Sequence, residues 1–371
     1  MRVDDVDFEL PPELVAQRPA AERDRARLMA LPRAPGPTRH LRVSSLPEIL
    51  PPGALLVVND TRVIGARLVG RKTSGGGRVE LLLVRREGSA EIQLSDGRAR
   101  RAPIWRARGR ASKPFRQGTD IELLRRDAPE PNDPALFARL VGHAPDGLLE
   151  VALWTADDAS VERALSACGR VPLPPYIKRQ PQPDDAERYQ TVYARHDGAI
   201  AAPTAGLHLT QALLERIESH GCEIAAVTLH VGLATFEPVR ADDFDAHVMH
   251  AERYHVPDST VDAVRRARVR RAPVVAVGTT TARALESAAD PHAPGLIIGG
   301  DGETRLLIQP GYRWQIVDGL FTNFHLARST LLAMVCSFAG TTQVMGAYRL
   351  AVDEGYRFFS YGDAMLLWRA S

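Results

Sequence analysis

Histidines able to move protons are concentrated in one part of this chain. Seven of the eleven lie within residues 196–255, and His325 lies further along. Imidazole changes its charge near neutral pH, so it serves as an acid, a base or a metal ligand. His247 and His250 are close enough in sequence to share a metal, but no HExxH motif or zinc-binding set of Cys and His accompanies them. The histidines therefore indicate acid–base chemistry, and we expect no metal.

Five loop segments combine polar side chains with Gly or Pro where a strand is expected to end. They are residues 59–62, 202–208, 228–232, 278–283 and 322–325. Ligands bind outside the carboxyl ends of strands in open α/β sheets. The Gly-Thr-Thr-Thr turn that begins at Gly278 also brings backbone N–H groups to a helix start, where a carboxylate or phosphate binds. One such turn can simply cap its helix, but five together predict a site.

The segments around these loops have the pattern of an α/β domain. Apolar runs predict strands at residues 55–58, 223–231, 274–277 and 358–368. Helices are predicted between Thr210 and Gly221 and at residues 258–270, 282–289, 329–339 and 343–353. Asp301-Gly302, between the apolar runs 296–298 and 303–308, predicts a hairpin turn.

A different pattern occupies residues 65–154. Short apolar stretches at 78–84, 121–124, 136–141 and 148–154 are separated by turn residues, as is typical of a small β-barrel. We therefore predict a mixed α/β (α+β) fold, with a catalytic body of residues 1–64 and 155–371 and an inserted all-β barrel of residues 65–154. The sheet of the body is expected to be mixed or closed into a barrel.

Charge is divided unevenly along the chain. The whole chain has a formal net charge of +2, but residues 65–126 hold 16 Lys and Arg against six Asp and Glu. That segment is therefore +10, and the remainder is −8. Such asymmetry favours a polyanionic partner such as nucleic acid, although an Arg-rich solvated surface produces the same count.

Composition excludes several classes of protein. With 371 residues, 44% hydrophobic and 25% charged, the chain is neither disordered nor collagenous. No apolar stretch approaches the ~20 residues that cross a bilayer, and the acidic N-terminus does not look like a leader. The three cysteines are far apart and odd in number, which indicates reduced thiols. We therefore expect a cytoplasmic protein without membrane contact, and a monomer.

Long ordered motifs throughout the chain resemble one family. They include Val-Asn-Asp-Thr-Arg-Val (58–63), Pro-Leu-Pro-Pro-Tyr-Ile (172–177), Arg-Tyr-Gln-Thr-Val-Tyr (188–193), and the segments 201–208, 228–238, 278–287, 322–326 and 356–365. This set is similar to the S-adenosylmethionine:tRNA ribosyltransferase-isomerases of queuosine biosynthesis. The inserted β segment matches least. Departures such as Leu209, Ala251 and Ala327 remove no titratable side chain.

The resemblance implies a fold and a reaction. The family fold is a mixed α/β body that carries an inserted β-barrel. Its enzymes transfer and isomerise the ribosyl group of S-adenosylmethionine onto 7-aminomethyl-7-deazaguanine at the tRNA wobble position. Epoxyqueuosine-tRNA forms, and adenine and methionine are released. A base must remove a proton from the ribose 5′ carbon and an acid must protonate the departing adenine, so groups titrating near neutrality are required.

The resemblance also implies roles for particular residues. The candidates for proton transfer are His208, His230, His325 and His250. Those for binding S-adenosylmethionine are Asp60, Arg62, Thr279, Thr280, Arg283, Glu252 and Asp363. Contacts with the tRNA backbone are expected from Arg98, Arg100, Arg101, Arg106 and Arg108, since phosphates are bound by Lys and Arg. Which histidine is the base and which the acid stays open.

Two other classes of function remain open at this point. A non-catalytic RNA-binding protein would not turn over S-adenosylmethionine, and the dense histidine loops count against it. A histidine-dependent metallohydrolase would be inactivated by a chelator, and the lack of a third ligand at zinc spacing counts against it.

Overall fold

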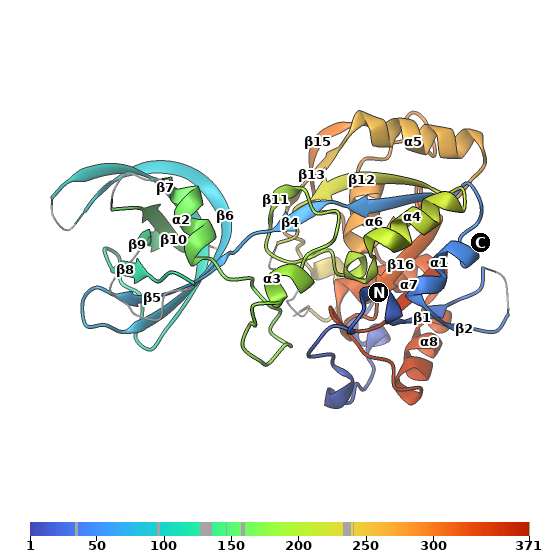
Figure 1. The fold of residues 1–371 in the computed structure, drawn as a ribbon, viewed down its shortest axis with the longest axis horizontal. Helices are drawn as coiled ribbons and strands as arrows, with labels where there is room; N and C mark the ends of the chain where they lie inside the picture. The colour runs from blue at the N-terminus through green and yellow to red at the C-terminus, as the bar shows by residue number, and fades with distance from the viewer. Residues whose placement is uncertain are drawn as a thin grey trace. The chain divides into compact units, whose positions relative to one another are not determined.

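The chain divides into two compact units, each of which is described by itself. The computed structural model describes residues 1–33, 36–94, 97–126, 136–145, 147–156, 160–232, 239 and 241–370. The larger unit comprises Met1–Arg62, Pro174–Gln180 and Glu187–Ser371. The smaller unit comprises Val63–Leu173 and Pro181–Ala186. Figure 1 shows the ribbon of both units.

A nine-stranded mixed sheet forms the centre of the larger unit, in the order β15-β13-β12-β3-β14-β16-β17-β1-β2. Its strands are β1 (Arg27–Ala30), β2 (Arg39–Arg42), β3 (Leu55–Asn59), β12 (Glu223–Leu229), β13 (Glu252–Val256), β14 (Val274–Val277), β15 (Gly300–Thr304), β16 (Gly319–Asn323) and β17 (Ala364–Trp368). Four neighbouring strands, β12, β3, β14 and β16, run parallel to one another. The pairing of β16 with β17 is antiparallel.

Two hydrophobic cores cover the two faces of this sheet, because successive side chains of a strand point to opposite faces. Leu55 and Val57 of β3 belong to one core, whereas Leu56 and Val58 belong to the other. The helices on the first face are α5 (Asp258–Val269), α6 (Thr279–Ser287), α7 (Thr330–Ala339) and α8 (Thr341–Asp353). Those on the second face are α1 (Leu46–Ile49) and α4 (Gln211–Ser219).

Shorter elements accompany these strands and helices. They are the 3-10 helices η1 (Val3–Val6), η2 (Pro12–Leu14), η3 (Arg23–Arg25), η4 (Val43–Ser45), η5 (Thr204–His208) and η7 (Phe244–Ala246), together with α3 (Asp185–Arg188). Strands β4 (Thr61–Val63) and β11 (His196–Ala199) form a separate two-stranded sheet.

The predicted hairpin at Asp301-Gly302 is wrong. Both residues lie inside β15, where they pair with His255 and Tyr254 of β13. A side chain at position 302 would lie 2.4 Å from the ring of Tyr254. The glycine is therefore required by the close approach of a cross-strand aromatic ring, and not by a turn. The strand predicted at 358–368 is confirmed only from Ala364 onward.

Six antiparallel strands close into a barrel in the smaller unit, in the order β10-β7-β6-β5-β8-β9. They are β5 (Arg67–Lys72), β6 (Arg78–Gln93), β7 (Ala99–Ala111), β8 (Asp120–Leu123), β9 (Leu136–His143) and β10 (Leu149–Trp154), and α2 (Val161–Cys168) follows them. Alternate residues such as Val79, Leu81 and Leu83 are buried inside the barrel. The α/β body and this barrel confirm the predicted fold class.

The helices are short compared with the thickness of a bilayer. Within the described residues, no single helix is long and apolar enough to span a membrane. The pair α7 and α8 reaches that length and hydropathy only when the two are taken together, and they are bent by 117° at their junction.

Candidate active site

The carboxyl ends of the four parallel strands meet at one edge of the large sheet. Each strand is followed there by one of the loop segments that the sequence predicts to form a site. Asp60 follows β3, His230 follows β12, Gly278 follows β14 and Phe324 follows β16. Asn59 ties two of these ends together, since its side-chain amide exchanges hydrogen bonds of 3.0 Å with the backbone N–H and carbonyl of Leu229. The ends of β3 and β12 are therefore joined by polar contacts.

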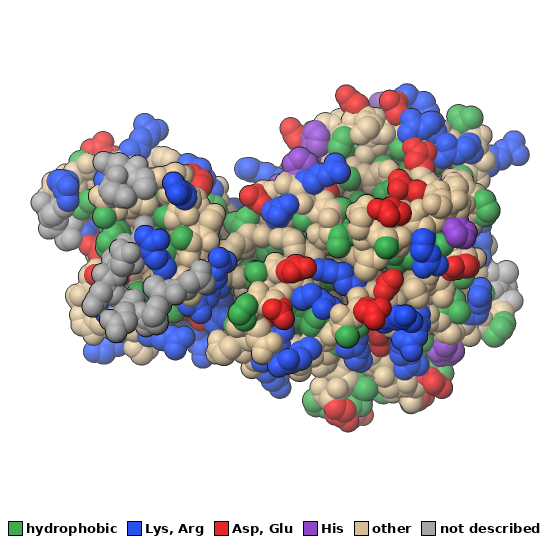
Figure 2. Space-filling view, in the orientation of Figure 1, with side chains coloured by type: hydrophobic (Ala, Val, Ile, Leu, Met, Phe, Trp, Pro, Cys, Tyr) green, Lys and Arg blue, Asp and Glu red, His purple; other side chains and the backbone are tan. Residues whose placement is uncertain are grey.

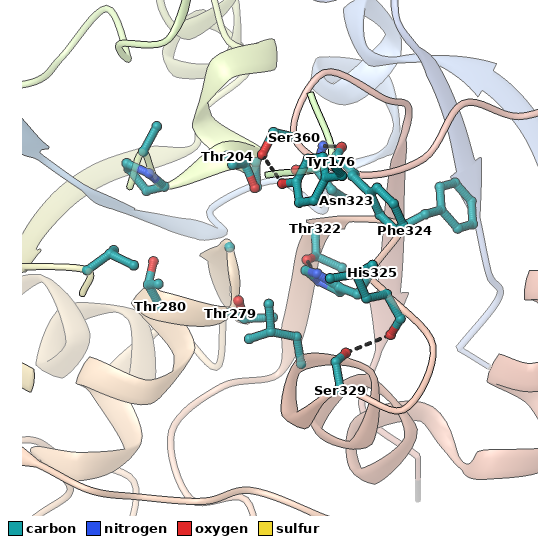
Figure 3. Close-up of a pocket in the computed structure, with 18 residues that line it drawn as sticks. Tyr176, Thr204, Thr279, Thr280, Thr322, Asn323, Phe324, His325, Ser329 and Ser360 are labelled. Carbon is teal, nitrogen blue, oxygen red and sulfur yellow. Dashed lines mark hydrogen bonds between the residues drawn. The ribbon is translucent and has the colours of Figure 1, made fainter. Parts of the chain in front are cut away.

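A pocket opens at this edge of the sheet. Its walls come from the segments around 202–205, 278–280, 322–331 and 359–360, together with Tyr176 and Val231. Figure 3 shows Thr279 and Thr280 on one side of the pocket and Thr322 and His325 on the other. Among the described residues that line it, the ionisable side chains are His325 and Tyr176, and there is no Asp, Glu, Lys or Arg.

His325 is the histidine that lines the pocket. Its Nε2 lies 2.8 Å from the hydroxyl of Thr322, and its backbone N–H donates to the Tyr348 hydroxyl at 2.9 Å. Burial lowers the pKa of His325 to about 4, because the charged imidazolium loses its hydration. The ring is therefore neutral at pH 7.

The start of α6 forms the opposite wall of the pocket. Gly278 has a φ of +92°, a conformation that lets the chain turn directly from β14 into the helix. No side chain caps this end, so the first N–H groups of α6 have no capping partner within the described residues. The Thr280 hydroxyl accepts a hydrogen bond of 3.3 Å from the Asn59 amide. This wall therefore presents free donors and the positive end of a helix dipole.

His208 lies at the same edge but lines a separate small cavity, together with Arg23 and Arg188. The amide Nδ2 of Asn323 lies 3.1 Å from its Nε2 and also donates to the Phe359 carbonyl at 3.0 Å. Burial, reinforced by the charge of Arg357, lowers the pKa of His208 to about 3. His208 is thus a neutral, fully engaged ring behind the pocket wall.

His230 is only partly buried, directly after β12. Its Nδ1 lies 2.8 Å from the hydroxyl of Thr61. Burial lowers the pKa of His230, the nearby His196 lowers it further, and Asp60 opposes both effects. Asp60 accepts a hydrogen bond of 2.6 Å from the Thr228 hydroxyl, and its other oxygen lies 3.6 Å from Nε2 of His196. These side chains form a second polar group beside Val231 of the pocket wall.

The remaining candidate residues for S-adenosylmethionine lie outside the pocket lining. Arg283 and Glu252 form a buried ion pair, and Glu252 also accepts a hydrogen bond from the Gly232 N–H at 3.1 Å. Asp363 accepts hydrogen bonds from the backbone N–H groups of Arg27 and Arg357.

Two further candidates are more open to solvent. Arg62 donates to the Ala194 carbonyl at 2.6 Å, with a side chain that is 48% exposed. His250 is exposed and is absent from the lining of both cavities that His325 and His208 line.

The arginines proposed for nucleic acid all lie in the β6–β7 region of the smaller unit. Arg101 and Arg108 are exposed, as is Arg98, which precedes β7. Arg106 pairs with Glu87 and Glu150, at 3.2 and 2.8 Å. Arg100 donates to the Thr155 carbonyl. On the face seen in Figure 2, blue basic side chains of this unit are interspersed with few red carboxylates.

Sequence reasoning missed Ser360 as a wall residue. Its hydroxyl lies 2.5 Å from that of Tyr176, and both line the pocket (Figure 3). The preceding Phe359 has a φ of +72°, which is rare for a bulky side chain and typical of functional sites. No pattern in the sequence signals such a backbone conformation, because it depends on contacts with Phe324 and Asn323.

A metal site would need several ligating side chains close together. Within the described part of the chain, no three His, Cys, Asp or Glu residues are arranged to bind one ion.

Known proteins resemble this chain over its whole length. The family model for queuosine biosynthesis protein matches residues 3–367. A protein of Sorangium cellulosum named S-adenosylmethionine:tRNA ribosyltransferase-isomerase is 52% identical, covering 99% of this chain and 98% of its own. One of the same name from Anaeromyxobacter is 50% identical over the full length of both. The crystal structure of S-adenosylmethionine tRNA ribosyltransferase from Thermotoga maritima is 35% identical, with a TM-score of 0.53 over 98% of this chain and 99% of that one.

Proposed function

This chain belongs to the S-adenosylmethionine:tRNA ribosyltransferase-isomerase family of queuosine biosynthesis enzymes, and on that premise we propose its substrates and products. It transfers and isomerises the ribosyl group of S-adenosylmethionine onto 7-aminomethyl-7-deazaguanine at the wobble position of tRNA. Epoxyqueuosine-tRNA, adenine and methionine are the products. The observation that carries the proposal is the pocket in which an uncapped helix start faces a neutral buried histidine.

S-adenosylmethionine occupies this pocket in our proposal. Its methionine carboxylate binds the first N–H groups of α6 and the hydroxyls of Thr279 and Thr280, because anions are stabilised at a helix N-terminus. Arg283 is already paired with Glu252, so the helix start supports carboxylate binding better than that guanidinium does. The rings of Tyr176 and Phe359, 4.7 Å apart, supply the aromatic faces that attract a sulfonium cation.

Proton transfer is divided between two histidines in this scheme. His325 accepts the proton from the ribose 5′ carbon, since its ring lines the pocket and is neutral at pH 7. His230, on the β12 side of the site, protonates the departing adenine. His208 is assigned to neither transfer, because it lines a separate cavity and not the pocket.

The polyanionic substrate is bound by the smaller unit in our proposal. Exposed arginines of the β6–β7 hairpin contact the tRNA backbone, as phosphates are bound by clustered Lys and Arg. Arg106 contributes little there, because Glu87 and Glu150 neutralise it.

The test is to incubate the purified chain with S-adenosylmethionine and a tRNA that carries the 7-aminomethyl-7-deazaguanine. Adenine and methionine are quantified by chromatography, and the anticodon nucleoside is identified by mass spectrometry. Equimolar adenine, methionine and modified nucleoside are expected. The proposal is overturned if adenine appears without modification of the tRNA, or does not appear at all.

A variant of His325 tests the role assigned to this side chain. His325→Gln keeps a hydrogen-bonding group where Nε2 meets Thr322 but cannot accept the proton. Adenine release should fall about 100-fold or more while S-adenosylmethionine binding is retained. His292→Ala removes an exposed histidine and is the matched control.

A further inference from the structure

We propose that Thr61 and Gly198 are positioning residues that together fix the imidazole of His230, so that its Nε2 is the nitrogen presented to substrate. Neither the sequence motifs nor the family comparison gives these two residues such a role. The inference rests on the proposed function, since it concerns the histidine that protonates the departing adenine.

Thr61 holds one edge of the ring. Its hydroxyl lies 2.8 Å from Nδ1 of His230, and the residue is completely buried. The backbone of Thr61 is itself anchored, because its N–H donates to the Asn59 side chain at 3.2 Å. The same Asn59 oxygen accepts from the Leu229 N–H, one residue before His230. Hydroxyl and imidazole are therefore tied to a common anchor, which keeps their separation fixed.

Gly198 makes a second close approach to the ring, also near Nδ1. It has a φ of +154°, and a Cβ added there would lie 2.6 Å from Nδ1 and 2.7 Å from Cε1 of His230. Real Cβ atoms do not approach other atoms this closely, so any side chain at 198 would displace the imidazole. The lack of a side chain at 198 therefore leaves room for the ring in its present orientation. Within the described residues, Nε2 has no hydrogen-bond partner and is left for a ligand.

Charged groups around the ring come from three elements. Asp60 follows β3, His196 and Asp197 belong to β11, and Arg253 belongs to β13. Asp60 and Asp197 favour the protonated ring, whereas His196 and Arg253 oppose it. The Thr61 hydroxyl contacts Nδ1 among these charges. We therefore expect loss of this hydroxyl to change both the orientation and the titration of His230.

Thr61→Val removes the hydroxyl and keeps the shape of the side chain. We expect kcat for adenine release to fall about 10- to 100-fold, since small misplacements of a catalytic group have costs of this size. The pH profile of kcat should shift as well, and Thr61→Ser should restore rate and profile. Thr260→Val is the matched control, because Thr260 is equally buried and its hydroxyl also makes one hydrogen bond, to the Ala226 carbonyl at 2.6 Å. An unchanged pH profile in Thr61→Val overturns the proposal, whatever the rate.

Gly198→Ala tests the second of these two contacts with the ring. The added methyl group should displace His230 and lower kcat by at least as much as Thr61→Val. Gly221→Ala controls for backbone strain alone, because Gly221 has a φ of +84° and nothing within 4 Å of an added Cβ. Equal activity of Gly198→Ala and the control overturns the assignment of Gly198.

NMR titration of the His230 ring separates this inference from the proposed function. The measurement needs no turnover, so it remains valid even if the wild-type chain releases no adenine. The ring 15N shifts and the pKa of His230 should differ between wild type and Thr61→Val, and should return in Thr61→Ser. Identical titrations in all three proteins overturn the positioning role.

Discussion

At the scale of single residues, the three histidines of the site differ in what surrounds them. The side-chain amide of Asn323 donates to the Phe359 carbonyl, so the atom facing His208 Nε2 is also its NH₂ group. Nε2 must then accept, and the neutral His208 ring has its proton on Nδ1. His325 and His230 instead meet threonine hydroxyls, at Nε2 and Nδ1 respectively. Equivalent imidazoles are thus given different chemistry by their neighbours.

Acid should destabilise the folded chain through His325 and His208. Their pKa values, lowered to about 4 and about 3, lie below the ordinary value of 6.5, so the unfolded state binds protons first as the pH falls. The free energy of unfolding should be constant with respect to these groups above pH 6.5 and should fall as the pH decreases from 6.5 toward 4. Urea unfolding at pH 7.5, 6.5, 5.5 and 5.0 measures this.

His325→Gln should show a weaker loss of stability over the same range, because one of the two groups is removed. His292→Ala, which removes an exposed histidine, should retain the wild-type dependence. The same dependence in His325→Gln and wild type would contradict the account of His325 as a buried neutral ring.

At the scale of elements, the site depends on the way β14 turns into α6. The strand is entirely buried, and the chain passes through one glycine before the helix begins. A φ of +92° with a ψ of 154° is a backbone conformation adopted essentially only by glycine. An added Cβ at Gly278 would meet only ordinary contacts, the nearest 3.6 Å away at Ala205, so the requirement comes from the backbone and not from crowding.

Gly278→Ala should therefore destabilise the fold by about 1–3 kcal/mol, the cost of such a conformation for a residue with a Cβ. It should also weaken S-adenosylmethionine binding, because the helix start moves away from its place in the pocket wall. Urea unfolding and isothermal titration calorimetry measure the two effects. Gly355→Ala, at a φ of +64° with nothing within 4 Å of the added Cβ, should lose stability without losing affinity.

At the scale of the whole molecule, positive charge is concentrated in residues 65–126, which belong to the smaller unit. Several of its arginines are paired within the barrel: Arg67 with Glu80, Arg71 with Glu122, and Arg139 with Asp120. Glu80, Glu122 and Asp120 are thus paired with arginines of the barrel wall. Arg101 and Arg108 of β7 are exposed. Exposure therefore separates Arg101 and Arg108 from the half-buried arginines of the barrel wall and places their charge where a polyanion can reach it.

Reversing the charge of two exposed arginines tests this separation. Arg101→Glu combined with Arg108→Glu should weaken tRNA binding and reduce its salt slope by about 1 for each phosphate that is no longer bound. S-adenosylmethionine binding should not change. Arg271→Glu, an exposed charge reversal in the larger unit, is the control. Unchanged affinity and salt slope in the double variant would remove the hairpin from the tRNA interface.

The sequence by itself determined the fold class, the main helices and the loops that meet at the site. Apolar periodicity and polar strand ends are local patterns, so residues such as Asn59 and Gly278 can be recognised from their neighbours in the chain. The tertiary structure alone decided which histidine lines the pocket, that Glu252 neutralises Arg283, and that Thr61 and not a carboxylate contacts His230. It also decided that Asp301-Gly302 belongs to a strand. These outcomes depend on burial and on contacts between residues far apart in the chain, which local sequence patterns do not contain.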